Sequence, residues 1–189
     1  MCGRYQFTLT DELREIVQEV ARRQPGAILK TGEVFPTNTA AILRGEGNSI
    51  LPEAANWGFP HFRSKGVLIN ARAETAGEKK TFRESLETRR CVIPSTGFFE
   101  WKQDESKQKY LFTLPGSEAL YMAGLYRDYQ GERRFVILTT APNRSVEDIH
   151  NRMPLVLPRE DIPRWLHGDG ALTILHRAPP LLHRAAAEQ

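Results

Sequence analysis

The spacing of apolar residues near the start of the chain predicts an amphipathic helix. Four apolar side chains recur at i, i+3, i+4 and i+7, which places them on one face of a helix: Leu13, Ile16, Val17 and Val20. Thr10 is a residue type that caps helix N-termini, and Pro25-Gly26 is a sequence that stops a helix. The pattern therefore predicts a helix from Thr10 to about Arg23.

Most other apolar positions fall in short runs rich in β-branched and aromatic residues, separated by turn residues. These runs predict strands at Thr39 to Leu43, Ser49 to Leu51, Val67 to Asn70, Arg90 to Ile93, Gly97 to Trp101, Tyr110 to Leu114, Leu120 to Tyr126, Phe135 to Thr140 and Leu172 to Leu175. Helices are expected over Ala76 to Arg89 and Glu160 to His167, with a single turn at Val146 to Ile149. We expect one α+β domain over residues 1–189, with a mainly antiparallel, curved or barrel-like sheet surrounded by a few helices.

Composition narrows the class of protein. With 189 residues the chain can bury a sizeable core without disulfides or a structural metal. Two cysteines and the absence of a long apolar run argue against a secreted disulfide framework and a membrane span, and favour a reduced cytoplasmic location. The histidines and cysteines show none of the usual metal-ligand spacings, so we expect no metal and no cofactor. A net charge of +3 permits a polyanionic partner without requiring one.

The second residue, Cys2, is the strongest chemical candidate. Removal of Met1 would leave a thiol and an α-amine on one residue, with ordinary pKa values of about 8.5 and about 8. Such a 1,2-aminothiol can attack a carbonyl through its thiolate, or close on an aldehyde to give a five-membered thiazolidine. The alternative interpretation is a frayed terminus, because most residues at this position have no specific role.

A second candidate segment joins a predicted strand to a predicted helix. Thr75 and Glu78 have capping-box spacing, so Asn70 and Arg72 would lie before a helix N-terminus. Backbone N–H groups and the helix dipole favour an anion there, and a guanidinium would add a bidentate donor for phosphate. The alternative is that Asn70 and Arg72 only stabilise a loop.

Two further segments each carry one titratable side chain. Glu100 lies among aromatic residues on a predicted strand, where alternation places it on the face of Phe98 and opposite Phe99 and Trp101. Apolar surroundings would raise its pKa toward the range useful for acid–base catalysis, unless the strand presents it to solvent. His150 follows the predicted turn at Val146 to Ile149 and could transfer a proton near pH 7, or could simply pack or cap.

Together these segments resemble one family, the SOS response-associated peptidase (SRAP) family of abasic-site-processing proteins. The matching motifs appear in order from Cys2 to about Leu157: Cys2-Gly3-Arg4-Tyr5, Trp57-Gly58, Asn70-Ala71-Arg72-x-Glu74-Thr75, Pro94-x-x-Gly97-Phe98-Phe99-Glu100-Trp101 and His150-x-Arg152-Met153-Pro154. Agreement at every spaced motif is far more specific than any one of them.

The resemblance implies a covalent chemistry on DNA. Similar proteins cross-link to abasic sites in single-stranded DNA, where the ring-opened sugar carries an aldehyde that a 1,2-aminothiol can capture. Under this resemblance Cys2 would form the imine and then the thiazolidine, Asn70 would hold the α-amine, and Glu100 and His150 would move protons. The family name also implies a peptidase that removes its own Met1, and the shared imine would permit weak lyase activity.

The resemblance further implies DNA recognition without sequence preference. Arg4, Arg72 and Arg152 are the candidate phosphate contacts, and Gly3 and Thr140 are further DNA-binding candidates. Pro36 and Trp57 resemble an apolar edge that meets bases or a strand junction, although Trp57 could equally be a core aromatic. We expect a monomer whose partner is abasic single-stranded DNA. The alternative functions are a cysteine-type peptidase without a DNA substrate and a non-covalent single-stranded DNA-binding module.

Overall fold

The computed structural model describes residues 2–61, 65–168 and 170–188. Its elements, in chain order, are β1 (Tyr5–Phe7), α1 (Asp11–Arg23), β2 (Gly32–Val34), β3 (Thr39–Glu46), β4 (Ser49–Trp57), β5 (Phe59–Pro60), β6 (Val67–Leu68), β7 (Asn70–Arg72), α2 (Arg83–Thr88), β8 (Arg90–Ser95), β9 (Gly97–Trp101), β10 (Lys109–Thr113), β11 (Leu120–Tyr129), β12 (Glu132–Thr140), β13 (Met153–Pro154), β14 (Val156–Leu157), a 3₁₀ turn (Arg159–Asp161), α3 (Ile162–His167), α4 (Ala171–Leu175) and β15 (His183–Ala186).

The centre of the molecule is a closed barrel. Strands pair in the cycle β12, β4, β3, β8, β11 and back to β12, and every pairing in this cycle is antiparallel except the parallel contact between β12 and β4. The barrel strands are long and carry mostly buried apolar residues, so closure removes both edges of the sheet and encloses the core. The α+β class with a barrel-like sheet is therefore confirmed.

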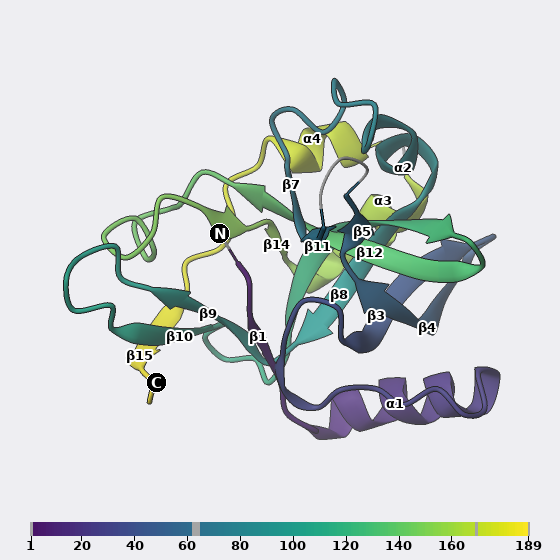
Figure 1. Ribbon diagram of the computed structural model, residues 1–189, viewed down its shortest axis with the longest axis horizontal. Helices are drawn as coiled ribbons and strands as arrows, with labels where there is room; N and C mark the ends of the chain where they lie inside the picture. Colours follow the sequence, from purple (N-terminus) through teal and green to yellow (C-terminus); the bar gives the residue numbers. More distant parts are fainter. Residues whose placement is uncertain (1, 62–64, 169, 189) are drawn as a thin grey trace.

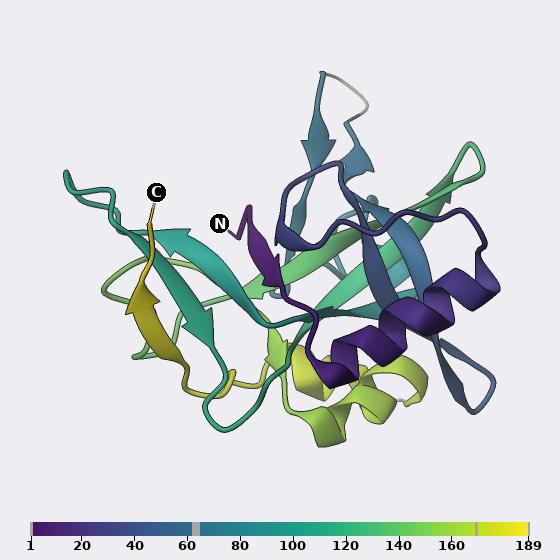
Figure 2. The same ribbon diagram turned by 90° about the horizontal axis from the view of Figure 1, so that it is seen from below.

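A second sheet lies beside the barrel. Its five strands run in the order β15, β10, β9, β1, β2, and they form the part of Figure 1 that contains both marked chain ends. In Figure 2 the N-terminal strand β1 passes between the outer strands of this sheet and the barrel. The apolar side chains of both sheets belong to one buried cluster, so the N-terminal residues are fixed by the core itself.

The helices lie outside the sheets. Helix α1 begins where predicted, because the Thr10 hydroxyl accepts a hydrogen bond from the Leu13 amide and caps the first turn. It runs along β3 and β4 in Figure 2, with Leu13, Ile16 and Val20 buried. Helices α2, α3 and α4 gather at another side of the barrel, seen at the top of Figure 1. Among the described residues, no helix combines the length and apolarity needed to span a membrane.

Two predicted elements are wrong. The helix expected over Ala76 to Arg89 shrinks to α2, because Phe82 and Leu86 are the only larger apolar residues there at helical spacing, and turns precede them. The strand expected at Leu172 to Leu175 is helix α4: Ala171, Ile174 and Leu175 are buried at i, i+3 and i+4, while Leu172 is exposed.

Candidate functional site

Cys2 lies completely inside the protein. Its side chain is 0% exposed, its carbonyl oxygen accepts a hydrogen bond from Asn70 Nδ2 at 3.2 Å, and its thiol faces the Arg4 carbonyl at 3.9 Å. Asn70 is the first residue of β7, which pairs in parallel with β12. The residue expected to be either a nucleophile or a frayed end is therefore ordered and held by the candidate amide.

Glu100 lies in the same buried region, on β9. Its side chain is 4% exposed, and burial raises its pKa to about 7. Near neutral pH this carboxyl is therefore divided between its acidic and basic forms. The expectation of a raised pKa among aromatic residues agrees with the structure, because Glu100 faces inward and not toward solvent.

His150 lies beside Glu100. Its Nε2 is 3.7 Å from Glu100 Oε2, and its Nδ1 accepts a hydrogen bond from the Arg152 backbone amide at 3.0 Å. Nδ1 lies within hydrogen-bond distance of both the Arg152 amide and the Arg152 carbonyl oxygen, at 3.0 and 3.1 Å, so either tautomer of the neutral ring finds a partner there. Burial also lowers the pKa of His150, which keeps the ring neutral at physiological pH.

The Cys2 thiol is electrostatically coupled to this pair. Burial raises its pKa well above the ordinary value, and the negative charge of Glu100 raises it further. The resting side chain is thus a thiol, and the formation of a thiolate requires a base within the site. A proton moving from the thiol to the Glu100 carboxylate would satisfy that need without adding a second negative charge.

The four candidate catalytic residues come from both parts of the fold. Cys2 precedes β1 and Glu100 lies on β9, which are neighbours in the five-stranded sheet. Asn70 lies on β7, and His150 shortly precedes β13, and both of these strands pair with β12 of the barrel. The site therefore forms where the two sheets meet, with the thiol, the amide, the carboxyl and the imidazole converging from distant points in the sequence.

Comparison with known proteins identifies the family. The family described as SOS response associated peptidase (SRAP) matches residues 1–187. The chain is a member of the SRAP family. The abasic site processing protein YoqW of Bacillus subtilis (strain 168) is 36% identical, covering 88% of this chain and 80% of that protein. The abasic site processing protein YedK of Escherichia coli (strain K12) is 28% identical, covering 88% and 79%.

Solved structures share the SRAP fold seen here. A crystal structure of a protein from Bacteroides thetaiotaomicron matches with a TM-score of 0.81 at 22% identity, covering 99% of this chain and 92% of that one. A protein from Bordetella bronchiseptica matches with a TM-score of 0.78 at 23% identity, over the full length of both chains. At this level of identity the likeness establishes the fold alone.

The candidate DNA-binding residues of this SRAP protein differ in exposure. Gly3, Arg4, Pro36 and Thr140 are partly exposed, and Arg72 is exposed. The Arg4 guanidinium lies over the Phe35 ring at 4.3 Å and the Trp101 ring at 4.9 Å, and it is paired with Glu33 at 3.2 Å. Sequence reasoning gave Phe35 no role, although it precedes Pro36 directly and is 37% exposed.

Trp57 is a core residue, so its assignment to a base-contacting edge is wrong. It is 0% exposed, its ring lies 5.3 Å from Tyr5 and 6.2 Å from Phe135, and its indole donates to the Ile69 carbonyl at 3.0 Å. A strand-end tryptophan in the barrel wall fills volume that only a large ring can fill. The core interpretation, left open by the sequence, is correct.

The Arg152 guanidinium is bound to other residues of the protein. It forms a bidentate ion pair with Glu74 at 2.8 and 2.9 Å, donates to the Thr139 carbonyl at 2.7 Å, and is 13% exposed. A phosphate would have to compete with this ion pair, and the DNA contact expected of Arg152 stays a prediction. The predicted helix N-terminus at Thr75 is also absent, because α2 begins at Arg83, and the anion site expected there is not formed.

Proposed function

We propose that this SRAP protein processes abasic sites in DNA by covalent capture through Cys2, once Met1 has been removed. Met1 lies outside the described residues. Two observations support the proposal: relatives that align over most of the chain are named abasic site processing proteins, and Cys2, Asn70, Glu100 and His150 converge in one buried site. The convergence is the observation that carries it, because it surrounds the one potential aminothiol with acid–base groups.

The reaction joins the aminothiol to the aldehyde of a ring-opened abasic sugar. The α-amine adds to the aldehyde carbon, and loss of water gives an imine. The thiolate then adds to the imine carbon, a C–S bond forms, and the C=N electron pair moves to nitrogen, which takes a proton. The sum is aldehyde plus aminothiol giving thiazolidine plus one water, with no oxidant or metal required.

Glu100 and His150 supply the proton transfers. With a pKa of about 7, Glu100 can accept the thiol proton in one step and return a proton in another. His150 is neutral and its Nε2 lies 3.7 Å from Glu100, so it can help open the sugar ring and exchange a proton with the carboxyl. Asn70 holds the Cys2 backbone, so the α-amine and the thiol stay at a fixed orientation.

The proposed DNA partner is single-stranded and is recognised through its backbone. Arg72 is exposed at the end of β7, only two residues after Asn70, which suits a phosphate contact beside the reacting sugar. The Phe35–Arg4–Trp101 stack provides exposed aromatic surface near Pro36 on which a base could rest. The same imine would allow strand cleavage when ring closure fails, and Cys2 could act on its own Met1 as a peptidase.

The test uses protein of verified intact mass lacking Met1, mixed with a single-stranded oligonucleotide that carries one abasic site. A band that resists denaturation, requires the abasic site and disappears in Cys2→Ala is the expected result. Cys91→Ala is the matched control, because Cys91 is also a buried free thiol but lies on β8 in the barrel, and it should retain the band.

Two outcomes would contradict the proposal. A band that persists in Cys2→Ala would exclude Cys2 as the linking residue. A complete absence of the band, with the oligonucleotide still bound under native conditions, would leave a non-covalent binding module. Cleavage of peptides by the same preparation without DNA would favour a general cysteine peptidase instead.

A further inference from the structure

Tyr5 carries a buried hydroxyl that the fold leaves without a hydrogen-bond partner. The residue is 0% exposed, and its oxygen makes no hydrogen bond to any described residue. A buried phenol normally finds a partner, since an unpaired polar group loses its hydration without compensation. Phenylalanine would fill the same volume without this cost, so the hydroxyl calls for a functional explanation.

Tyr5 lies on the sheet face that carries Glu100. On paired strands β1 and β9, Tyr5 lies opposite Phe98, so the two side chains occupy the same face of the sheet. Glu100 lies two residues beyond Phe98 and therefore shares that face. Tyr5 also lies three residues after Cys2, and a negative charge on Cys2 raises the pKa of Tyr5 beyond the increase that burial causes.

A second unpartnered polar atom lies in the same region. Asn70 Oδ1 is buried and forms no hydrogen bond with the described residues, while its Nδ2 holds the Cys2 carbonyl. The interior around Cys2 thus contains an unused donor, the Tyr5 hydroxyl, and an unused acceptor, Asn70 Oδ1. An arrangement of this kind fits a site whose polar partners appear only when the reacting groups change charge or position.

We propose that the Tyr5 hydroxyl is a further catalytic group, which donates a hydrogen bond to the Cys2 sulfur when the thiol becomes a thiolate. The inference rests on the proposed function for its catalytic meaning. At rest the thiol faces the Arg4 carbonyl, so the side chain must turn toward Tyr5 as it ionises. The proton itself goes to Glu100, and Tyr5 keeps its own proton throughout and stabilises the charge that develops on sulfur.

A hydrogen bond from the Tyr5 hydroxyl stabilises the Cys2 thiolate more than the Cys2 thiol. A neutral thiol is a weak acceptor, so the hydroxyl gains little from it in the resting state, whereas a thiolate is a charged acceptor and forms a stronger hydrogen bond. The gain therefore falls mainly on the reactive form, which is the condition for accelerating a chemical step. Glu100 on β9, with His150 beside it, also acts on the thiol, and in protein lacking Met1 the α-amine of Cys2 is a further titratable group on the same residue.

The decisive variant is Tyr5→Phe, which keeps the ring and removes one oxygen. The thiol is followed through the ¹³Cβ signal of Cys2 in a pH titration of protein lacking Met1, in a Cys91→Ala background that leaves one titrating cysteine. We expect the pKa of Cys2 to rise by about one unit, which is a tenfold smaller thiolate population at a given pH. Covalent capture of an abasic oligonucleotide should slow by about tenfold as well.

The control is Tyr121→Phe, which removes a mostly buried hydroxyl that is bonded to Glu12 away from the site. It should change neither the Cys2 titration nor capture. The proposal is overturned if Tyr5→Phe leaves the Cys2 titration unchanged, or if it unfolds the protein, since that would show a structural partner for the hydroxyl. The titration needs no DNA, so it tests Tyr5 even if the abasic-site proposal fails.

Discussion

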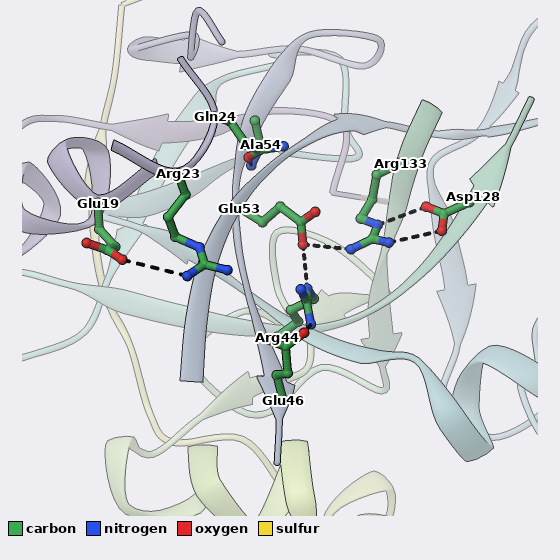
Figure 3. A network of polar contacts seen from close by, with 9 residues as sticks. All are labelled: Glu19, Arg23, Gln24, Arg44, Glu46, Glu53, Ala54, Asp128 and Arg133. Carbon is green, nitrogen blue, oxygen red and sulfur yellow. Dashed lines mark hydrogen bonds and ion pairs between the residues drawn. The ribbon is translucent and has the colours of Figure 1, made fainter. Parts of the chain in front are cut away.

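Two polar clusters of this protein use the same side-chain types for different ends. Figure 3 shows a network centred on Glu53 of β4, where one carboxylate oxygen receives Arg44 at 2.5 Å and Arg133 at 2.7 Å. Arg133 also forms two hydrogen bonds with Asp128. In the Cys2 site, Glu100 instead faces a neutral imidazole and a thiol. The Glu53 carboxylate is held by two guanidinium groups, whereas burial brings the pKa of Glu100 to about 7.

The comparison teaches that the neighbours of a carboxyl decide its use. At the Glu53 network the hydrogen bond to Asp128 and the nearby Glu53 carboxylate raise the pKa of Arg133, so this guanidinium stays charged, and the ion pairs join β3, β4, β11 and β12. At the Cys2 site burial brings the pKa of Glu100 to about 7, so the proton can leave and return. Substitutions in the Cys2 site should therefore mainly slow covalent capture, and substitutions in the Glu53 network should mainly lower the free energy of unfolding.

The largest effect is expected for Glu100→Gln. Loss of the group that accepts the thiol proton should slow covalent capture by about 100-fold, the scale of acid–base catalysis, and remove the inflection near pH 7 from the rate profile. Single-turnover capture at several pH values measures both. Retention of the inflection in Glu100→Gln would assign it to another group.

The same variant separates reactivity from stability. The pKa of Glu100 is about 7 in the folded chain and about 4.3 in an unfolded one, so the folded state binds the extra proton between these values. Its contribution to stability is full below pH 4 and is lost as pH rises through 7, at a cost of about 3.5 kcal/mol. Urea denaturation at pH 5 and pH 8 should show that decrease in the wild type and a smaller decrease in Glu100→Gln.

A smaller effect on capture is expected for Asn70→Ala. The variant loses the hydrogen bond to the Cys2 carbonyl, so the aminothiol is less well oriented and capture should slow by about tenfold. Asn56→Ala is the matched control, since this amide accepts a hydrogen bond from the Thr39 hydroxyl on the barrel wall and should leave capture intact. Equal rates for both variants would refute the orienting role of Asn70.

No effect on capture is expected for Glu53→Gln, although it should lower the free energy of unfolding by about 2 kcal/mol. The substitution leaves Arg44 and Arg133, with side chains 16% and 23% exposed, facing each other without the carboxylate between them. Glu46→Gln, at the exposed end of the same network, should cost less. Chemical denaturation measures the loss, and reduced capture by folded Glu53→Gln would break the distinction between the clusters.

Sequence patterns located elements wherever local and tertiary preferences agree. Helix α1 was predictable because its apolar stripe and the Thr10 cap specify the same bounds. Strand β9 was predicted with its bounds intact, and alternation along it placed Glu100 on the face of Phe98, which the structure shows to be buried. The short strands β1 and β2 were missed, because three-residue strands have no periodicity of their own and exist through pairing with each other and with β9.

Motif spacing named four candidate residues that the structure brings together, but it did not give the arrangement around them. Motif spacing pointed to Cys2, Asn70, Glu100 and His150, but nothing local distinguishes a buried Trp57 from an exposed one, since only closure of the barrel decides it. The engagement of Arg152 with Glu74 has the same origin, because the two residues are far apart in sequence. Tyr5 belongs to the Cys2-Gly3-Arg4-Tyr5 motif, but that motif says nothing of its hydroxyl, which stands out only because the fold leaves it without a hydrogen-bond partner among the described residues.

The site joins segments that are far apart in the sequence, and this affects when it can form during synthesis. The Cys2–Asn70 hydrogen bond spans 68 residues, and the Glu74–Arg152 pair spans 78. Contacts between such distant segments form late in folding, because long loops must close first. A nascent chain therefore exposes its N-terminus to processing enzymes while the acid–base groups are still being translated. If Met1 is removed during translation, the aminothiol would form before the site around it is assembled.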